Sequence, residues 1–287
     1  MKAFTYLTPS STAEAVGLLE AHAPHARVIA GGQTLLLGMK TRTERPGVLV
    51  SLAGIADLAG LRVANSGELV VGATTTYAAL SRAALTGWHA EISAVAGNLA
   101  DRPVRTMGTI GGALCAADPR FDMLTLVTGT GGQLDVLAPT GVRTLAPQEF
   151  FRPVGGITLA PNEILASIRF PAASTYTCVA FEKFRQRTFD AAVASVLCAV
   201  RVDDAGRLDV IRIAVGAVSP VPVLAERTAA DLTGSPVAAV DPDGAARRIV
   251  TEVFAGHGDT PAEQYRRELV KALARKALRN ALFSPRS

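Results

Sequence analysis

Cysteine is scarce in this chain. Its 287 residues include only Cys115, Cys178 and Cys198, which lie far apart and form no C-x-x-C pair. Disulfide frameworks, zinc sites and iron–sulfur clusters need more cysteines at closer spacing. The sequence therefore argues against a disulfide scaffold and against a metal site carried by this chain alone. Cys198 stands between Leu197 and Ala199 and is expected to be a small core residue.

Aromatic residues and net charge are also low. Phe, Trp and Tyr make up 5% of the sequence, and the formal charge is +4. A nucleic-acid-binding domain usually has a stronger basic balance with interleaved aromatic residues. No nucleic-acid partner is therefore expected.

Long apolar runs are missing as well. No stretch of 18 apolar residues occurs, so no membrane-spanning helix is predicted. The polar run Thr8 to Ser11 interrupts the start before the apolar core of a signal peptide could develop. Together with the few cysteines, this predicts a cytoplasmic protein. Hydrophobic residues at 49% and charged residues at 19% indicate an ordered globular chain, long enough for two domains.

Residues for acid–base or hydrolytic chemistry are few. The four histidines, His22, His25, His89 and His257, show no metal-ligand spacing such as HExxH. No serine stands in the G-x-S-x-G context of a nucleophile elbow. Such a chain is better interpreted as the carrier of a cofactor, because a bound cofactor performs the chemistry while the protein supplies position and electrostatics.

Two glycine-containing segments stand out against this background. They are RVIAGGQTLLLGMK, residues 27–40, and GTIGGALCAADPRFD, residues 108–122. A glycine pair can adopt positive φ and lacks Cβ atoms, so its N–H groups can approach an anion such as phosphate closely. Two such segments in one domain favour a ligand with a diphosphate that is held from two sides. Each pair taken singly is also consistent with an ordinary tight turn.

Better known phosphate-binding motifs do not fit these segments. A Walker A loop has four residues between its glycines and a lysine directly after the second, whereas Gly32 and Gly38 are separated by five residues and Met39 precedes Lys40. The G-x-G-x-x-G pattern of a dinucleotide-binding helix is absent from both segments. A different type of cradle is therefore expected.

The two segments resemble the paired flavin-binding signatures of the FAD-binding medium subunit of molybdenum hydroxylases, the family of the xanthine dehydrogenase and carbon monoxide dehydrogenase flavoproteins. The resemblance extends to FTYLTPSSTAEAVGLL at residues 4–19, EILASIRFP at 163–171 and FEKFRQRTFDAAVASV at 181–196. It therefore covers nearly the whole chain. Paired signatures at this spacing are more specific than one glycine motif.

The resemblance implies that the chain binds FAD and that no residue of its own is catalytic. The main chain around the first glycine pair and the Thr34 hydroxyl would wrap the diphosphate, which involves Val28, Ile29, Ala30, Gly31, Gly32, Gln33, Thr34 and Leu35. Thr109, Gly111 and Gly112 would close on it from the other side, with Leu99 and Gly108 lining the cavity. Asp122 would accept hydrogen bonds from ribose or ribitol hydroxyls. Leu165 would pack near the ring system, and Lys183 would reach the polar edge of the flavin, where a cation stabilises the anionic reduced form.

Other interpretations of single residues stay open. Lys183 alternates with Arg185 and Arg187, as expected for an exposed face of a strand. Asp122 could form a loop ion pair with Arg120. Ala113 and Ala116 stand where the family usually has polar residues, so one or two side-chain hydrogen bonds to the cofactor would be missing, each worth about 1 kcal/mol.

The resemblance also implies an assembly. The chain would take electrons from the iron–sulfur clusters of a small 2Fe-2S subunit and pass them to NAD, a quinone or oxygen. A large molybdopterin-binding subunit would hydroxylate the substrate, and the whole would be a dimer of heterotrimers. Two alternatives are a non-catalytic scaffold or assembly protein that has lost tight flavin binding, and a stand-alone FAD oxidase, which the lack of a positioned base disfavours.

The expected fold class is α+β. Residues 1–173 would form a two-lobed FAD-binding domain of the PCMH/vanillyl-alcohol-oxidase-like type, with lobes at about 1–55 and 56–173. Residues 174–287 would form a smaller domain of a three-stranded antiparallel sheet and three helices. The patterns predict a capping box at Ser11 and Glu14, a hairpin over 132–145, and a final helix over 261–282 with a basic outer face.

Overall fold

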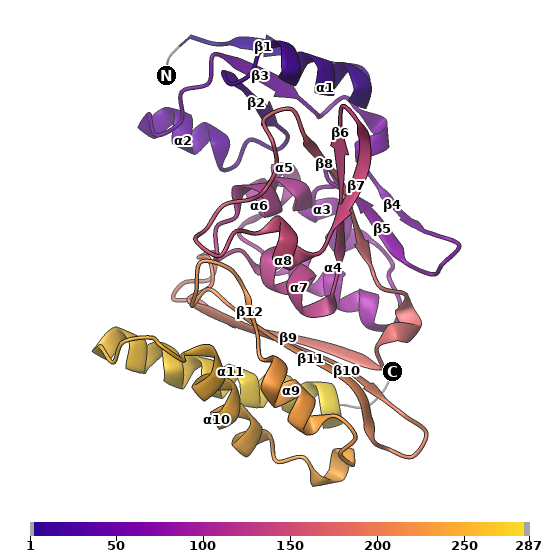
Figure 1. Ribbon diagram of the computed structural model, residues 1–287, viewed down its shortest axis with the longest axis vertical. Helices are drawn as coiled ribbons and strands as arrows, with labels where there is room; N and C mark the ends of the chain where they lie inside the picture. Colours follow the sequence, from indigo (N-terminus) through magenta and orange to yellow (C-terminus); the bar gives the residue numbers. More distant parts are fainter. Residues whose placement is uncertain (1–2, 284–287) are drawn as a thin grey trace.

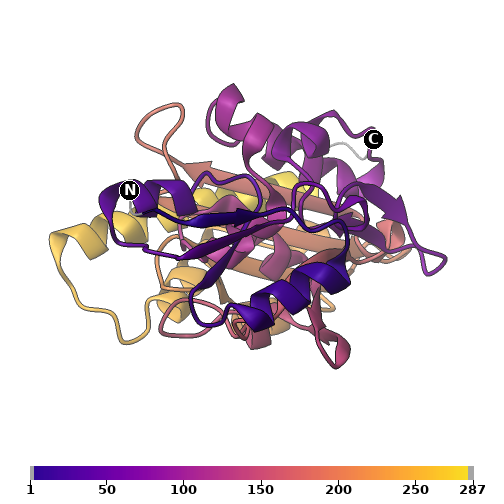
Figure 2. The same ribbon diagram turned by 90° about the horizontal axis from the view of Figure 1, so that it is seen from above.

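The computed structural model describes residues 3–283 and stacks three β-sheets along its longest axis (Figure 1). The smallest sheet lies at the N-terminal end, a five-stranded sheet lies in the middle, and a four-stranded sheet carries the C-terminal helices. Viewed along that axis, the N-terminal sheet overlies the strands of the C-terminal sheet (Figure 2). The mixed architecture agrees with the expected fold class.

The N-terminal sheet is parallel, with strand order β1-β3-β2. Its strands are β1 (Thr5–Leu7), β2 (Ala26–Ile29) and β3 (Val48–Ser51). Helix α1 (Thr12–Ala21) buries Leu19 in one cluster with Val50 of β3. Ser11 caps α1 as predicted, but Glu14 accepts from the N–H and hydroxyl of Ser10 (2.8 and 2.9 Å), one residue before the expected donor. Helix α2 (Leu35–Thr41) follows the first glycine pair.

The middle sheet is antiparallel, with strand order β4-β5-β8-β6-β7. Its strands are β4 (Leu61–Val63), β5 (Leu69–Gly72), β6 (Gln133–Ala138), β7 (Gly141–Leu145) and β8 (Ile164–Phe170). The β6–β7 hairpin is the one that the sequence predicted. The helices that accompany the sheet are α3 (Tyr77–Arg82), α4 (Ala90–Gly97), α5 (Arg102–Met107), α6 (Ile110–Ala116), α7 (Asp122–Thr130) and α8 (Pro147–Phe150).

The C-terminal sheet is antiparallel, with strand order β12-β11-β10-β9. Its strands are β9 (Cys178–Phe184), β10 (Ala194–Val202), β11 (Leu208–Gly216) and β12 (Val223–Leu224). The two-residue β12 makes it four-stranded, one strand more than expected, because two residues show no alternation in sequence. The three predicted helices are α9 (Glu226–Leu232), α10 (Pro242–Val253) and α11 (Pro261–Phe283), and Figure 1 shows them on one side of this sheet. Short 3₁₀ helices occur at Ala56–Leu58, Gly87–His89, Ala173–Thr175 and Val237–Ala239.

Helix α7 joins the middle and C-terminal layers. All of its residues are buried, and Leu126 belongs to the same apolar cluster as Leu197 of β10 and Ala214 of β11. Its last carbonyl groups are capped from the C-terminal half: Arg212 donates to the carbonyls of Thr128 and Gly129 (3.0 and 2.9 Å), and the Tyr176 hydroxyl donates to that of Thr130 (2.9 Å). The two halves of the chain therefore share one core around α7.

Glu252 of α10 caps a second helix, α9. Its carboxylate accepts the N–H groups of Arg227 and Thr228 (2.8 and 2.9 Å) and the Thr228 hydroxyl (2.8 Å). Burial acts to raise the pKa of Glu252, but these hydrogen bonds outweigh it and hold the pKa below its ordinary 4.5. We expect Glu252→Ala to lower the free energy of unfolding by about 1–2 kcal/mol at neutral pH.

The pH dependence of this cap has a definite sign. Because the folded-state pKa lies below the unfolded one, the stabilisation is present above the unfolded pKa and is lost as the pH falls through the folded pKa. Denaturant unfolding of both proteins at pH 7 and at about pH 4 measures it, and the difference between wild type and Glu252→Ala should shrink at the lower pH. A difference that grows with acidification would contradict the capping role.

Candidate functional site

The two glycine segments lie in direct contact. Gly31 follows β2, and a Cβ atom placed on it would overlap the carbonyl oxygen of Met107, the last residue of α5. The same Cβ would stand 3.1 Å from the Cα of Gly108, where the second segment begins. Two bends about eighty residues apart in sequence thus meet at one place, and glycine is needed at position 31 for that approach.

The remaining glycines serve different purposes. Gly32 has φ +69°, in the left-handed region. Gly111 packs closely on the chain at Ala73, because a Cβ on Gly111 would stand 2.5 Å from the Ala73 Cβ. A Cβ on Gly112 would meet only the Thr109 hydroxyl oxygen, at 2.8 Å. Positive φ was thus a correct expectation for Gly32, but not for Gly31, Gly111 or Gly112.

The second glycine pair is helical rather than a turn. Thr109 is the N-cap of α6, and its hydroxyl accepts the Gly112 N–H (3.1 Å). The Gly111 N–H donates to the Ala73 carbonyl (2.9 Å), so it is used inside the protein. The prediction that both pairs offer an open run of N–H groups is therefore wrong for this one. The second pair contributes in another way: because Gly111 has no side chain, the backbone of α6 can approach Ala73 closely.

The first segment does offer such a run. Across residues 3–283, no protein acceptor is found for the N–H groups of Gly32, Gln33, Thr34 and Leu35, nor for the Thr34 hydroxyl. Val28 and Ile29 are in β2, paired with Val50 and Ser51, and hold the segment on the sheet. Consecutive unpaired N–H groups on a fixed strand end can bind an anionic ligand such as a diphosphate.

Asp122, the last residue of the second segment, forms a buried ion pair with Lys183. Asp122 is the first residue of α7 and Lys183 lies in β9, so the pair joins the two halves of the chain. Their side chains are 2% and 8% exposed. Lys183 also donates to the carbonyl of Asn98 (3.0 Å), while the second carboxylate oxygen of Asp122 is buried and has no donor among residues 3–283. That orphaned acceptor fits a ligand that brings a hydroxyl group.

Two alternative interpretations of this pair are wrong. Lys183 is not on an exposed strand face, because its side chain points into the buried space at Asp122. Arg120 does not bind Asp122: its guanidinium forms two hydrogen bonds with Asp118 (2.9 and 2.6 Å). Burial raises the pKa of Asp122, and the charges of Lys183 and Arg185 oppose that rise.

Tyr77 of α3 packs against the start of the second segment. Its ring would touch a Cβ placed on Gly108 (3.0 Å), and its N–H donates to the Gly108 carbonyl (3.0 Å). Burial, together with the charge of Asp122, raises the pKa of its phenol well above the ordinary value. Tyr77 therefore packs against the second segment at Gly108, and its phenol remains neutral at physiological pH.

Leu99 and Leu165, the leucines expected near the cavity and the ring system, have different surroundings. Leu99 lies in the connection between α4 and α5, partly buried against the central core, close to the carbonyl that Lys183 binds. Leu165 of β8 is fully enclosed in that core. Its neighbour Ala166 accepts the Ala73 N–H (2.8 Å), and Ala73 in turn accepts the Gly111 N–H. Leu165 thus lies under the second segment as part of its support.

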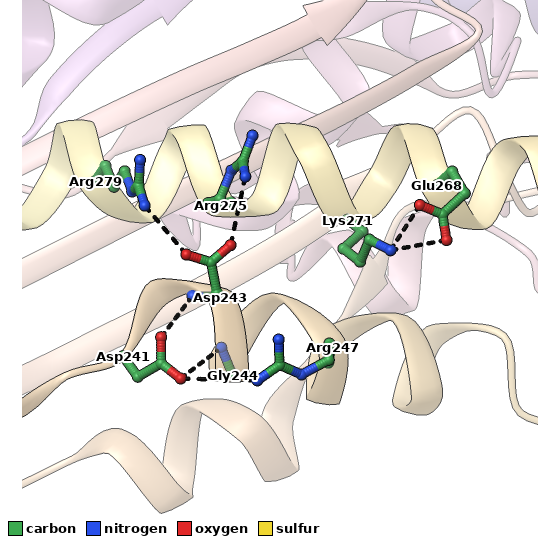
Figure 3. Close-up of polar contacts among 8 residues, drawn as sticks. All are labelled: Asp241, Asp243, Gly244, Arg247, Glu268, Lys271, Arg275 and Arg279. Carbon is green, nitrogen blue, oxygen red and sulfur yellow. Dashed lines mark hydrogen bonds and ion pairs between the residues drawn. The ribbon is translucent and has the colours of Figure 1, made fainter.

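The basic outer face of α11 is compensated within the chain. Arg275 and Arg279 both bind Asp243 of α10 (3.4 and 3.1 Å), and Lys271 binds Glu268 (2.6 Å), as Figure 3 shows. Lys276 binds Glu182 of β9 (2.8 Å). Part of the positive charge on this face is therefore paired within the chain.

Comparisons with known proteins agree with this geometry. A family model described as "FAD binding domain in molybdopterin dehydrogenase" matches residues 2–173, and one described as "CO dehydrogenase flavoprotein C-terminal domain" matches residues 179–281. The carbon monoxide dehydrogenase medium chain of Afipia carboxidovorans is 32% identical, over 97% of this chain and 96% of that protein. The xanthine dehydrogenase FAD-binding subunit of Escherichia coli O157:H7 is 24% identical over 97% of this chain and 96% of that protein.

Solved structures agree as well. The match to reconstituted CO dehydrogenase from Oligotropha carboxidovorans has a TM-score of 0.89 at 29% identity and covers 100% of this chain and 99% of that one. Quinoline 2-oxidoreductase from Pseudomonas putida 86 matches with a TM-score of 0.84 at 27% identity, over 98% of each chain. Residues 3–283 contain no helix long and apolar enough to cross a membrane. By sequence and by structure, the chain belongs to the family of FAD-binding medium subunits of molybdenum hydroxylases.

Proposed function

We propose that this chain holds one FAD where the two glycine segments meet, takes electrons from iron–sulfur clusters of a small partner subunit and passes them to an external acceptor. The observation that carries the proposal is the contact of Gly31 with Met107 and Gly108, beside the unpaired N–H groups of residues 32–35. A diphosphate needs such donors from a rigid backbone. The flavin would supply the redox chemistry, and the chain would supply position and charge.

Each part of the site has a separate task in this proposal. The N–H groups of Gly32 to Leu35 and the Thr34 hydroxyl would bind the diphosphate. The free carboxylate oxygen of Asp122 would accept a hydrogen bond from a ribitol or ribose hydroxyl. Among residues 3–283, Lys183 donates to Asp122 and Asn98, which leaves one ammonium N–H for a ligand, and its charge would favour an anionic reduced ring.

The assembly follows from the relatives. Proteins that match over nearly their whole length are named as medium chains or FAD-binding subunits of dehydrogenases, which implies that other subunits complete the enzyme. We propose a large molybdopterin-binding subunit and a small 2Fe-2S subunit, assembled as a dimer of heterotrimers. The chain is 32% identical to the carbon monoxide dehydrogenase medium chain and 24% identical to the xanthine dehydrogenase subunit. This difference favours an enzyme similar to carbon monoxide dehydrogenase over one similar to xanthine dehydrogenase.

Reconstitution with FAD tests the proposal directly. The purified chain should bind one FAD per molecule, seen as a change in visible absorbance and a loss of flavin fluorescence. A preparation that stays colourless with FAD in excess would contradict the proposal and favour the scaffold alternative. That alternative gains some support from Ala113 and Ala116, which give the second segment no polar side chains at these positions.

Charge at position 32 provides a sharper test. Gly32→Asp would place a carboxylate beside the bound diphosphate, whereas Gly32→Asn introduces a side chain of the same shape without the charge. Both residues tolerate the left-handed backbone at φ +69° better than most, so backbone strain is matched. We expect the Asp variant to bind FAD about tenfold more weakly than the Asn variant, or worse, at low salt. Fluorescence titration measures the two affinities for FAD. Equal affinities would show that the diphosphate does not bind at this segment.

A further inference from the structure

The connection between α4 and α5, residues 98–101, is held by three cations. We call these residues the strap. Arg185 donates through one terminal nitrogen to the Asn98 carbonyl (2.9 Å) and through the other to the Asn98 side-chain oxygen (2.9 Å). Arg105 donates to the carbonyls of Leu99 and Ala100 (2.7 Å each), and Lys183 shares the Asn98 carbonyl. Three successive carbonyl groups at the C-terminal end of α4 are therefore fixed by positive charge, which also suits the negative end of that helix.

The strap needs such a clamp because its backbone is strained. Ala100 has φ +38°, in a region that alanine seldom adopts. A strained conformation persists only where surrounding contacts over-determine it. Arg105 provides that restraint from inside the same lobe, whereas Arg185 provides it from β9–β10, in the other half of the chain.

The strap in turn sets the position of both glycine segments. Its last residue, Asp101, is the N-cap of α5 and accepts the N–H of Val104 (2.9 Å). Helix α5 has only six residues and ends at Met107, whose carbonyl packs on Gly31. A displacement at the strap would therefore move the surface on which the first segment rests. Leu99 of the strap would move with it.

We propose that Arg185 is a positioning residue of the cofactor site: through its forked hydrogen bonds to Asn98 it fixes the strap, and through the strap the meeting of the two glycine segments. This inference rests on the proposed function, that FAD binds there. An arginine suits the task because its planar guanidinium binds two acceptors in a fixed geometry, which a lysine cannot reproduce. Two other charged residues lie next to this contact: Lys183, which shares the Asn98 carbonyl with Arg185, and Asp122, which pairs with Lys183.

The experiment compares Arg185→Lys, Arg185→Gln and Asn98→Ala with Arg187→Gln. Arg187 lies exposed in the same loop, and within residues 3–283 its side chain makes no hydrogen bond or ion pair, so it is a matched control for charge. FAD affinity and the rate of FAD release are measured by fluorescence, and the melting temperature of the FAD-free protein is measured separately. We expect about tenfold weaker binding and faster release for both Arg185 variants, with Arg187→Gln near wild type. The double variant Arg185→Gln/Asn98→Ala should lose little more than the worse single one.

The outcomes separate this inference from the proposed function. If the wild-type protein binds no FAD, both the proposed function and the positioning role of Arg185 are wrong. Wild type that binds FAD, with Arg185→Gln equal to it or equal to Arg187→Gln, would overturn only the positioning role. A lower melting temperature of the FAD-free Arg185 variants with an unchanged rate of FAD release would also overturn it, because a purely structural contact behaves in that way.

Discussion

Replacing Gly31 with alanine is expected to abolish FAD binding. The added methyl group would overlap the Met107 carbonyl, which is backbone and cannot rotate away. Relief requires the first glycine segment to move off α5, and this separates the two halves of the proposed cradle. A misplacement of about 1 Å is enough to disrupt a preorganised site. FAD per molecule after reconstitution measures the effect, and we expect it to fall to background.

Gly17→Ala is the matched control for this change. Gly17 lies in α1, and a Cβ there would have no atom within 4 Å. The same methyl addition should leave FAD content unchanged and raise the free energy of unfolding by up to about 1 kcal/mol, because alanine is the better helix former. Overpacking at Gly31 should cost about 1–3 kcal/mol, so unfolding must be followed in both variants. A folded Gly31→Ala protein with normal FAD content would show that the contact has no part in the site.

Replacing Lys183 with methionine should cause the largest loss of stability, about 3–5 kcal/mol. The change leaves the Asp122 carboxylate buried without its cation, and an uncompensated buried charge is far more costly than a lost surface pair. Lys276→Met is the control, since Lys276 binds Glu182 with its side chain 64% exposed and should contribute no more than about 1 kcal/mol. Denaturant unfolding of the FAD-free proteins compares them.

The pH dependence of Lys183→Met checks the cause. Burial already raises the pKa of Asp122, and removal of the cation that opposes this rise will raise it further. A folded-state pKa above the unfolded one favours folding at low pH and disfavours it as the pH rises. The variant should therefore lie closer to wild type at pH 5 than at pH 8. The double variant Asp122→Leu/Lys183→Met should regain most of the loss, and failure of both expectations would rule out the buried charge as the cause.

The sequence alone predicted the elements that depend on local signals. The β6–β7 hairpin follows from two alternating runs around Pro139-Thr140, and Ser11 caps α1 as its position before an amphipathic run suggests. The glycine segments were recognisable for the same reason, because a main-chain cradle needs residues without side chains at fixed places along one short stretch. The basic face of α11 was also visible, but its compensation by Asp243 was not.

Helices α6 and α7 escaped prediction because their sequences lack a helical signal. The glycine pair lies in the first turn of α6, and glycine is a poor helix former. Every residue of α7 is buried, its threonines included, so it lacks the charged, exposed face that marks a surface helix. Both helices depend on tertiary packing: α7 packs against β10 and β11, and α6 packs against α7 and β8.

The sequence by itself determined which family the chain resembles, and from that it predicted which residues would line a flavin site. Only the tertiary structure decided that Asp122 and Lys183 are partners, that Arg185 reaches Asn98, and that Met107 fills the space left by Gly31. The physical reason is range. Backbone conformation and capping depend on neighbours a few residues away, whereas burial, charge pairing and close approach depend on segments 61 to 87 residues apart that meet only when the sheets stack.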